Sequence, residues 1–223
     1  NAAVLGTSLN WGFLHAQPLT DPRLISMPYC VRPQELLYTY GGASTAGALP
    51  RWFVNNLAGG ERGGIYDQLQ EEVARQEVPA GSNGLVALPY FMGERTPIWD
   101  ESASGAIVGL SLSHTRADIY RSLLESAAYS LRHIMESSAP DAPPEKIVLV
   151  GGGSKSALWK QIFADVTGIP ILTPAEPLEA PLGDAYLAAM AMGLQTDFSR
   201  VRTWVPFQAP VLPRAPDHEA YQA

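Results

Sequence analysis

The pattern of apolar and polar positions first predicts a pair of short antiparallel strands at the start of the chain. Apolar runs at 3–5 and 11–14 flank a turn at 6–10 that holds Gly6, Thr7 and Ser8. Short apolar runs around a glycine and serine turn are typical of a hairpin. A further strand is expected over 35–40, ended by two glycines, and a shorter one over 24–27 within a loop.

Apolar residues at helical spacing predict helices over 64–76 and, most clearly, from Thr115 to Met135. Thr115 and Asp118 have the spacing of a capping box, and the apolar stripe after them continues for about five turns. Another helix is expected over residues 49–57, with Pro50 in its first turn and Ser44 or Thr45 as its cap.

Strands and helices alternate in the second half of the chain. An apolar strand at 146–150 runs into the turn 151–154 and then into a helix that ends at Gly168. A short strand at 169–173 and a helix at 183–193 follow, and another short strand is expected at 106–110. Pro-rich segments at 139–144 and 206–216 read as a break and a surface tail. The sequence therefore predicts the α/β class, with a mixed sheet flanked by helices.

Composition and charge exclude several classes of protein. The 223 residues are 46% hydrophobic and 17% charged, as in an ordinary soluble domain. No apolar run is long enough for a membrane span, and no signal peptide is recognisable. A net charge of -7 speaks against a nucleic-acid partner. The single Cys30 excludes an internal disulfide framework, and four scattered histidines show no metal-ligand spacing, so we expect a cytoplasmic protein. Asn1 and Ala2 are interpreted as a tag remnant outside the fold.

Two glycine turns are candidate anion sites. The turn Gly151-Gly152-Gly153-Ser154 opens a helix, where backbone N–H groups approach a ligand closely and the helix end is partly positive. Its spacing matches neither the dinucleotide fingerprint nor the P-loop, and the alternative is a structural turn with Ser154 or Ser156 as the helix cap. The turn at 6–8 either binds phosphate oxygens or is an ordinary hairpin turn.

Other polar residues carry weaker signals. Glu94-Arg95 and Asp100-Glu101 form the densest cluster, which either orients a substrate or, the favoured alternative, holds an internal ion pair at a turn. His114 and His133 are expected at a helix end and in packing, and Cys30 has no activating partner. No nucleophile, histidine and acid set is recognisable.

Five motifs in order carry a family resemblance. They are GTS at 6–8, GGASTAGALPRW at 41–52, PYFMGERTPIWD at 89–100, GAIVGLSLSHTRADIYRSLLESAAYSL at 105–131 and VGGGSKSALWKQIFADVTGIPI at 150–171. Together they resemble the C-terminal domain of the FGGY carbohydrate kinases, nearest to the xylulokinase-like branch, from about residue 3 to 193. Leu123 departs from the family's second signature.

The resemblance implies an actin-like, ribonuclease-H-like ATPase domain over 3–223, one of two domains that clamp ATP and a sugar. Gly6 and Thr7 would hold the β- and γ-phosphates, with Ser8 in the same turn. Gly47 would line the adenine and ribose pocket beside Arg51. Gly152, Gly153 and Ser156 would form the other wall, with the glycines leaving room for the base. Gly151 and Ser154 are the remaining binding residues that the resemblance implies, and Asn10 is the candidate for a sugar contact.

The implied reaction is phosphoryl transfer from ATP with Mg²⁺ to a sugar hydroxyl, in which positioning and charge neutralisation do most of the work. Family members use an Asp base and acidic Mg²⁺ ligands from the domain that this chain lacks, so no catalytic residue and no metal ligand is assigned in it. The chain alone is expected to bind ATP or ADP weakly and to phosphorylate no sugar. Arg51 and the turn at 93–97 count against glycerol and favour a pentulose or related ketose.

Other functions and assemblies stay open from the sequence. An actin-like regulator or scaffold would use nucleotide without sugar kinase activity, and a plain α/β domain would have no nucleotide site. A homodimer is one assembly that fits. The kinase interpretation requires that the two glycine turns, which are far apart in the chain, face one another across a single cleft.

Overall fold

A mixed six-stranded sheet forms the centre of the fold in the computed structural model, which describes residues 1–19, 21–138, 143–176 and 179–222. The strand order is β3-β4-β2-β1-β7-β8. The first four strands in this order pair antiparallel, and β1, β7 and β8 pair parallel. The strands are β1 (Ala2–Leu5), β2 (Leu9–His15), β3 (Ile25–Pro28), β4 (Leu37–Ala43), β7 (Ile147–Val150) and β8 (Ile171–Leu172). The predicted α/β class with a mixed sheet is confirmed.

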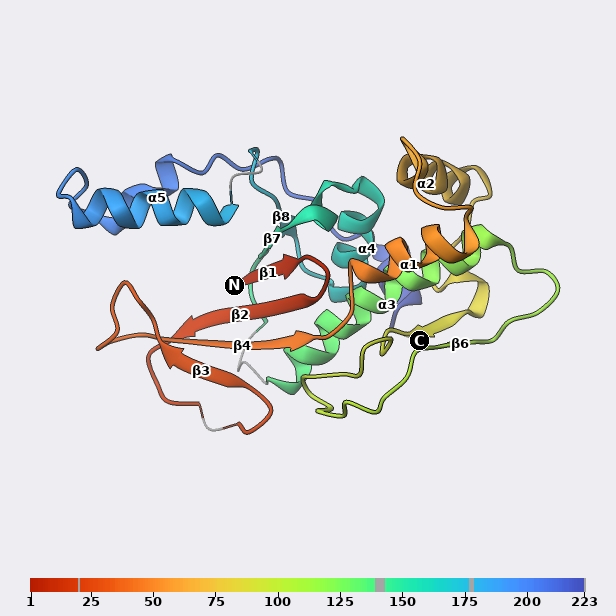
Figure 1. Ribbon diagram of the computed structural model, residues 1–223, viewed down its shortest axis with the longest axis horizontal. Helices are drawn as coiled ribbons and strands as arrows, with labels where there is room; N and C mark the ends of the chain where they lie inside the picture. The colour runs from red at the N-terminus through yellow and green to blue at the C-terminus, as the bar shows by residue number, and fades with distance from the viewer. Residues whose placement is uncertain (20, 139–142, 177–178, 223) are drawn as a thin grey trace.

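Helices flank this sheet, and a separate two-stranded ribbon lies against the long helix α3, at the end of the molecule away from the sheet (Figure 1). Helices α1, α2 and α4 all contact the long α3, which itself contacts β2 and β4. Helix α5 lies at the opposite end of the molecule from α2 (Figure 1). The elements are α1 (Ala48–Leu57), α2 (Ile65–Arg75), α3 (Arg116–Ser137), α4 (Ala157–Thr167), α5 (Glu179–Ala191), α6 (Ala215–Ala220) and the ribbon β5 (Val86–Leu88) with β6 (Ala106–Val108).

The core lies between the sheet and the helices. Strand side chains alternate between the two faces of a sheet, so every second residue of β1, β2 and β7 points to the helices. These residues are fully or almost fully buried: Ala3, Leu5, Leu9, Trp11, Ile147 and Leu149. Val4, between two of them, is 43% exposed on the opposite face. The same alternation places Asn10, between Leu9 and Trp11, on that opposite face.

Helix α3 begins with the predicted capping box. The Thr115 hydroxyl accepts a hydrogen bond from the Ala117 N–H, and the Asp118 carboxylate accepts one from the Thr115 N–H at 2.7 Å. Burial raises the pKa of Asp118, but the hydrogen bonds from Thr115 and Asn83 outweigh burial, so the pKa is lowered. A carboxyl with a lowered folded-state pKa stabilises the fold above its unfolded-state pKa, and this contribution is lost as the pH falls through the folded-state value.

Replacing Asp118 by asparagine is therefore expected to cost about 1–2 kcal/mol at pH 7. The cost should shrink as the pH falls below about 4, because the unfolded-state carboxyl is protonated there first and the folded-state carboxyl, whose pKa is lowered, only at a lower pH. Urea unfolding of both proteins between pH 7 and pH 3 measures the difference. A difference in unfolding free energy that stays constant over this pH range would contradict the proposal that the ionised Asp118 carboxylate stabilises the fold.

Several expected boundaries shift. Residues 1 and 2 were expected to lie outside the fold, and this is wrong: Ala2 begins β1 and the Asn1 carbonyl accepts a hydrogen bond from the Val148 N–H. Helix α5 begins four residues before the predicted 183, while the strands at 106 and 171 are shorter than predicted. The 206–216 tail is mostly exposed, as predicted. The predicted break at 139–144 lies mainly outside the described residues. Within those residues, no helix combines the length and the apolar character needed to cross a membrane.

Candidate functional site

The two glycine turns lie side by side because the strands before them are parallel neighbours. Val4 of β1 is paired with Val150 of β7, so both strands end at the same edge of the sheet. Gly151 has φ +97°, and a Cβ on it would lie 2.5 Å from the Leu5 carbonyl oxygen. Glycine at 151 is therefore required by the close approach of the two strand ends.

The β1–β2 turn is held from its other side by the start of α1. The N–H groups of Ala46 and Ala48 donate to the Thr7 carbonyl oxygen at 2.9 and 3.2 Å, and the Gly47 N–H donates to the Gly6 carbonyl oxygen at 2.9 Å. Gly47 is the N-cap residue of α1 and no side chain caps this helix. The expectation that Ser44 or Thr45 caps it is wrong, because the turn's carbonyl oxygens already satisfy these N–H groups.

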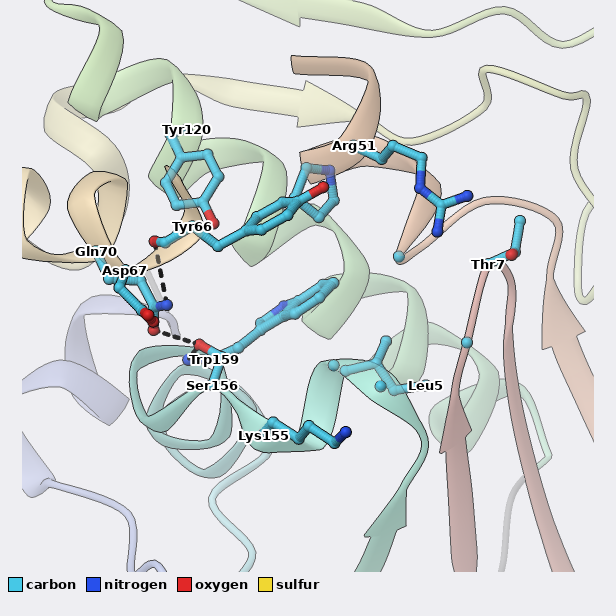
Figure 2. A pocket seen from close by; sticks show the side chains of 15 residues that line it. Leu5, Thr7, Arg51, Tyr66, Asp67, Gln70, Tyr120, Lys155, Ser156 and Trp159 are labelled. Carbon is cyan, nitrogen blue, oxygen red and sulfur yellow. Dashed lines mark hydrogen bonds between the residues drawn. The ribbon is translucent and has the colours of Figure 1, made fainter. Parts of the chain in front are cut away.

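Both turns open into one cavity of about 420 Å³. Figure 2 shows it with the side chains of α2 and Trp159 at one end and Thr7 at the other. The Thr7 hydroxyl is exposed and has no hydrogen-bond partner among the described residues. The lining residues are Leu5, Gly6, Thr7, Gly47, Pro50, Arg51, Tyr66, Asp67, Gln70, Tyr120, Gly152, Gly153, Lys155, Ser156 and Trp159.

One end of the cavity has aromatic walls. Tyr66 on α2 and Trp159 on α4 lie on opposite sides of it (Figure 2), and the buried Tyr120 of α3 lies behind them. Burial raises the pKa of Tyr120 far above its ordinary value, so its hydroxyl stays protonated. The Trp159 indole N–H donates to the Leu124 carbonyl oxygen at 2.8 Å, which fixes this ring against α3. Aromatic walls of this kind suit a planar ligand group.

Ser156 joins two walls of the cavity. Its hydroxyl accepts a hydrogen bond from the Trp159 N–H at 3.0 Å and donates to the Gln70 side-chain oxygen at 2.6 Å. The Gln70 amide in turn donates to the Tyr66 carbonyl oxygen at 3.2 Å. Ser156 is thus the cap of α4, one of the two serines considered for that role, and it ties α4 to α2. Ser154 instead donates to the Gly151 carbonyl oxygen at 2.8 Å.

The glycines after β7 differ in what surrounds them. A Cβ on Gly153 would lie 2.5 Å from a methyl carbon of Leu5 and 2.9 Å from the Trp159 ring. A Cβ on Gly152 would meet no atom within 4 Å, although this residue lines the cavity. Gly153 therefore allows close packing, whereas the space beside Gly152 is open to a ligand.

Seven of the eleven predicted binding residues line this cavity, and four do not. Ser8 uses its carbonyl oxygen to accept from the Gly6 N–H, and Gly151 and Ser154 lie in the turn behind the wall. Asn10 points to the other face of the sheet, where its side-chain oxygen lies 3.4 Å from Arg95 Nη2. The contact of Asn10 with a sugar stays a prediction.

The prediction of an internal ion pair at residues 94–101 is wrong. Glu94 accepts hydrogen bonds from the N–H groups of Ser44 and Arg95, while the Arg95 guanidinium donates to the Ala43 carbonyl oxygen at 3.0 Å. Burial raises the pKa of Glu94. Asp100 accepts from the Ser102 N–H and hydroxyl. The Glu94 and Arg95 side chains therefore hydrogen-bond to backbone groups, because the loop that carries them folds back on the end of β4.

Sequence reasoning missed the wall that α2 supplies. The apolar spacing that predicts this helix corresponds to its buried stripe of Ile65, Leu69 and Val73, but nothing in the sequence singles out Tyr66, Asp67 and Gln70, which line the cavity. A polar and aromatic set at this spacing is an ordinary exposed helix face, so only the tertiary position of α2 reveals its role. Lys155 and Trp159 were also missed, although both belong to the glycine-rich motif.

No group of three His, Cys, Asp or Glu side chains placed to hold a metal ion occurs in the described parts of the chain. Asp67 is the single acidic residue of the cavity lining. The arrangement fits a ligand with a flat apolar group at one end and an anionic group at the two turns.

Comparison with known proteins places this geometry in a family. Residues 1–192 match the model described as the FGGY family of carbohydrate kinases, C-terminal domain. The chain is 31% identical over 198 residues to the xylulose kinase of Staphylococcus xylosus, which covers 87% of this chain and 39% of that protein. It is 38% identical over 165 residues to the ribulokinase of Mycolicibacterium smegmatis, covering 70% of this chain and 29% of that protein. Gluconokinases and glycerol kinases also match.

The solved structures agree with these sequence matches. The ligand-bound xylulose kinase of Lactobacillus acidophilus superposes with a TM-score of 0.87 at 27% identity, over 99% of this chain and 44% of that chain. These kinases have the actin-like ATPase fold, so the predicted fold is confirmed. The chain spans less than half the length of each of these relatives.

Proposed function

Because the chain belongs to the FGGY family of carbohydrate kinases, as their C-terminal domain, we propose that its cavity is the nucleotide half of the active site of an ATP-dependent sugar kinase. Kinases of this family are ATP-dependent phosphotransferases. The observation that carries the proposal is the meeting of the two glycine turns on one cavity. The same geometry speaks against the plain domain without a nucleotide site.

In this proposal the adenine ring occupies the aromatic end of the cavity. Tyr66 and Trp159 flank it, and the open space beside Gly152 accommodates its edge. The phosphates extend to the β1–β2 turn, where the free Thr7 hydroxyl donates to a phosphate oxygen. Ser156 shapes this pocket through the Gln70 contact, because its single proton is already donated.

The chain's contribution to the reaction is the positioning of the phosphate chain. Backbone contacts from α1 fix the β1–β2 turn, so the Thr7 backbone is held in place before the nucleotide arrives. Sugar kinases of this family use a divalent metal, which neutralises phosphate charge. The described residues contain no group of His, Cys, Asp or Glu side chains that could hold this ion by itself. The proton of the sugar hydroxyl that accepts the phosphate would be taken by a base in the part of the family's kinases to which this chain does not align.

A pentulose or related ketose is the sugar that we propose. Two of the relatives are named for pentuloses, xylulose and ribulose. Asn10, after the phosphate turn, is the residue of this chain that we propose for a sugar hydroxyl.

Calorimetric titration with MgADP tests the nucleotide site. Gly152→Val is expected to weaken binding at least tenfold, because its side chain would fill open space that the base needs, with little change in stability. Thr7→Ala should weaken it less, by the loss of one hydrogen bond.

Gly183→Val is the matched control. A Cβ there also meets no atom within 4 Å, but Gly183 lies on α5 outside the cavity lining. This variant should bind as the wild type does. Equal heats for wild type, Gly152→Val and Thr7→Ala would refute the nucleotide site.

A further inference from the structure

Three side chains of the cavity lining carry formal charge: Arg51, Asp67 and Lys155. Arg51 is partly neutralised by Glu61, whose carboxylate oxygen lies 3.8 Å from its Nε. Asp67 lies in the first turn of α2, where the helix N-terminus favours a negative charge. Lys155 is exposed, and no side-chain partner holds its ammonium group within the described ranges. It is therefore the cation of the lining that is left without an opposite charge.

Lys155 is placed by the glycine turn that forms the cavity wall. The turn continues as a short 3-10 helix over Gly152–Lys155, and Ser156 directly after it caps α4. Figure 2 shows the Lys155 side chain below Leu5, directed away from Asp67 and toward the side of the cavity where Thr7 lies. The fixed backbone on both sides of Lys155 keeps the base of its flexible side chain at the cavity wall, so the ammonium group can reach a ligand in the cavity.

This placement gives the cavity an electrostatic direction. The acidic Asp67 lies at the end with Tyr66 and Trp159, and Lys155 points to the end with the free Thr7 hydroxyl. The chain carries a net charge of -7, which disfavours an incoming nucleotide polyphosphate. A local unpaired cation offsets this repulsion where the negative charge of the ligand would lie.

We propose that Lys155 is a substrate-binding residue that holds the nucleotide's phosphates from the wall opposite Thr7. Its ammonium group donates charge-assisted hydrogen bonds to non-bridging phosphate oxygens of bound ADP or ATP. This inference rests on the proposed nucleotide site. It adds to that site a phosphate contact from a lysine side chain, beyond the contacts that the glycine residues and Thr7 supply. The nucleotide is then oriented by charge as well as by shape, with its base at Asp67 and its phosphates at Lys155.

Titration of the 223-residue chain with MgADP and with adenosine tests this assignment. Lys155→Gln is expected to weaken MgADP binding about tenfold, because one charge-assisted contact is lost, and to leave adenosine binding unchanged. The difference in MgADP affinity should shrink as salt is added. Lys155→Arg should keep most of the affinity.

Lys160→Gln is the control, because Lys160 lies on α4 outside the cavity lining and donates to Gln208 at 3.3 Å. Unchanged MgADP affinity in Lys155→Gln, or an equal loss for MgADP and adenosine, would overturn the inference while the nucleotide site stands. Binding of neither ligand to the wild type would overturn the nucleotide site and this inference together.

Discussion

Replacing Arg121 by methionine is expected to lower the free energy of unfolding by about 3–5 kcal/mol. Arg121 and Glu125 form an ion pair of 2.8 Å inside the domain, where the Glu125 side chain is fully buried. Glu125 also accepts hydrogen bonds from Ser82, Tyr221 and the Gly81 N–H. Without the guanidinium, the Glu125 carboxylate would remain buried without its cationic partner.

Arg132→Met provides a matched control on the same helix. Arg132 pairs with Glu136 at the same spacing of four residues, but this pair is far less buried. Arg132 also donates to the Tyr221 carbonyl oxygen and to the Gln222 side chain, so its loss should cost about 1–2 kcal/mol, less than the loss of Arg121. Urea unfolding measures all variants. Where Arg121→Met does not fold, Tyr221→Phe gives the test: the Tyr221 hydroxyl donates to Glu125 and accepts from Arg121, and losing these two bonds to charged groups should cost about 1.5–3 kcal/mol or more. Equal costs for Arg121→Met and Arg132→Met would contradict this account.

Gly47→Val is expected to cost about 1–3 kcal/mol and to weaken MgADP binding more than tenfold. A Cβ at this position would collide with the Gly6 carbonyl oxygen and lie 3.0 Å from its carbon, and neither backbone atom can rotate away. The Gly47 N–H also donates to that same oxygen. To relieve the collision, the start of α1 must therefore move away from the β1–β2 turn, and this hydrogen bond breaks.

The matched control for Gly47 is Gly63→Val. Gly63 lies in the segment before α2, and a Cβ there would meet no atom within 4 Å. Calorimetry with MgADP and urea unfolding should show a loss in Gly47→Val alone. A Gly47→Val protein with wild-type affinity and stability would show that the turn does not depend on α1.

Local signals predicted the parts of the site that one segment determines. The capping box and apolar stripe of α3 depend on neighbours within the helix, and the glycine turn after β7 depends on the strand before it. These features appeared where expected. The parallel pairing of β1 with β7 joins residues 146 positions apart along the chain, as Val4 and Val150 illustrate, and no local pattern predicts it. The family motifs led only to the expectation that the two glycine turns face one another across one cleft, and both turns do line one cavity.

Contacts between distant segments explain what the sequence did not reveal. Ser44 and Thr45 have the right chemistry to cap α1, but the carbonyl oxygens of a turn about 40 residues earlier take that role. Ser156 reads as a ligand residue or a cap, and its bond to Gln70 cannot be seen without the position of α2. Likewise Glu94 and Arg95 look like an ion pair until their backbone partners are known.

The cavity wall is assembled from five stretches of the chain: residues 5–7, 47–51, 66–70, 120 and 152–159. None of these stretches could recognise a nucleotide by itself, because each supplies only one side of the enclosure. Ligand recognition is consequently a property of the cooperatively folded domain. By mass action, a bound nucleotide would stabilise all five stretches at once, so local opening of any one of them would be coupled to ligand release.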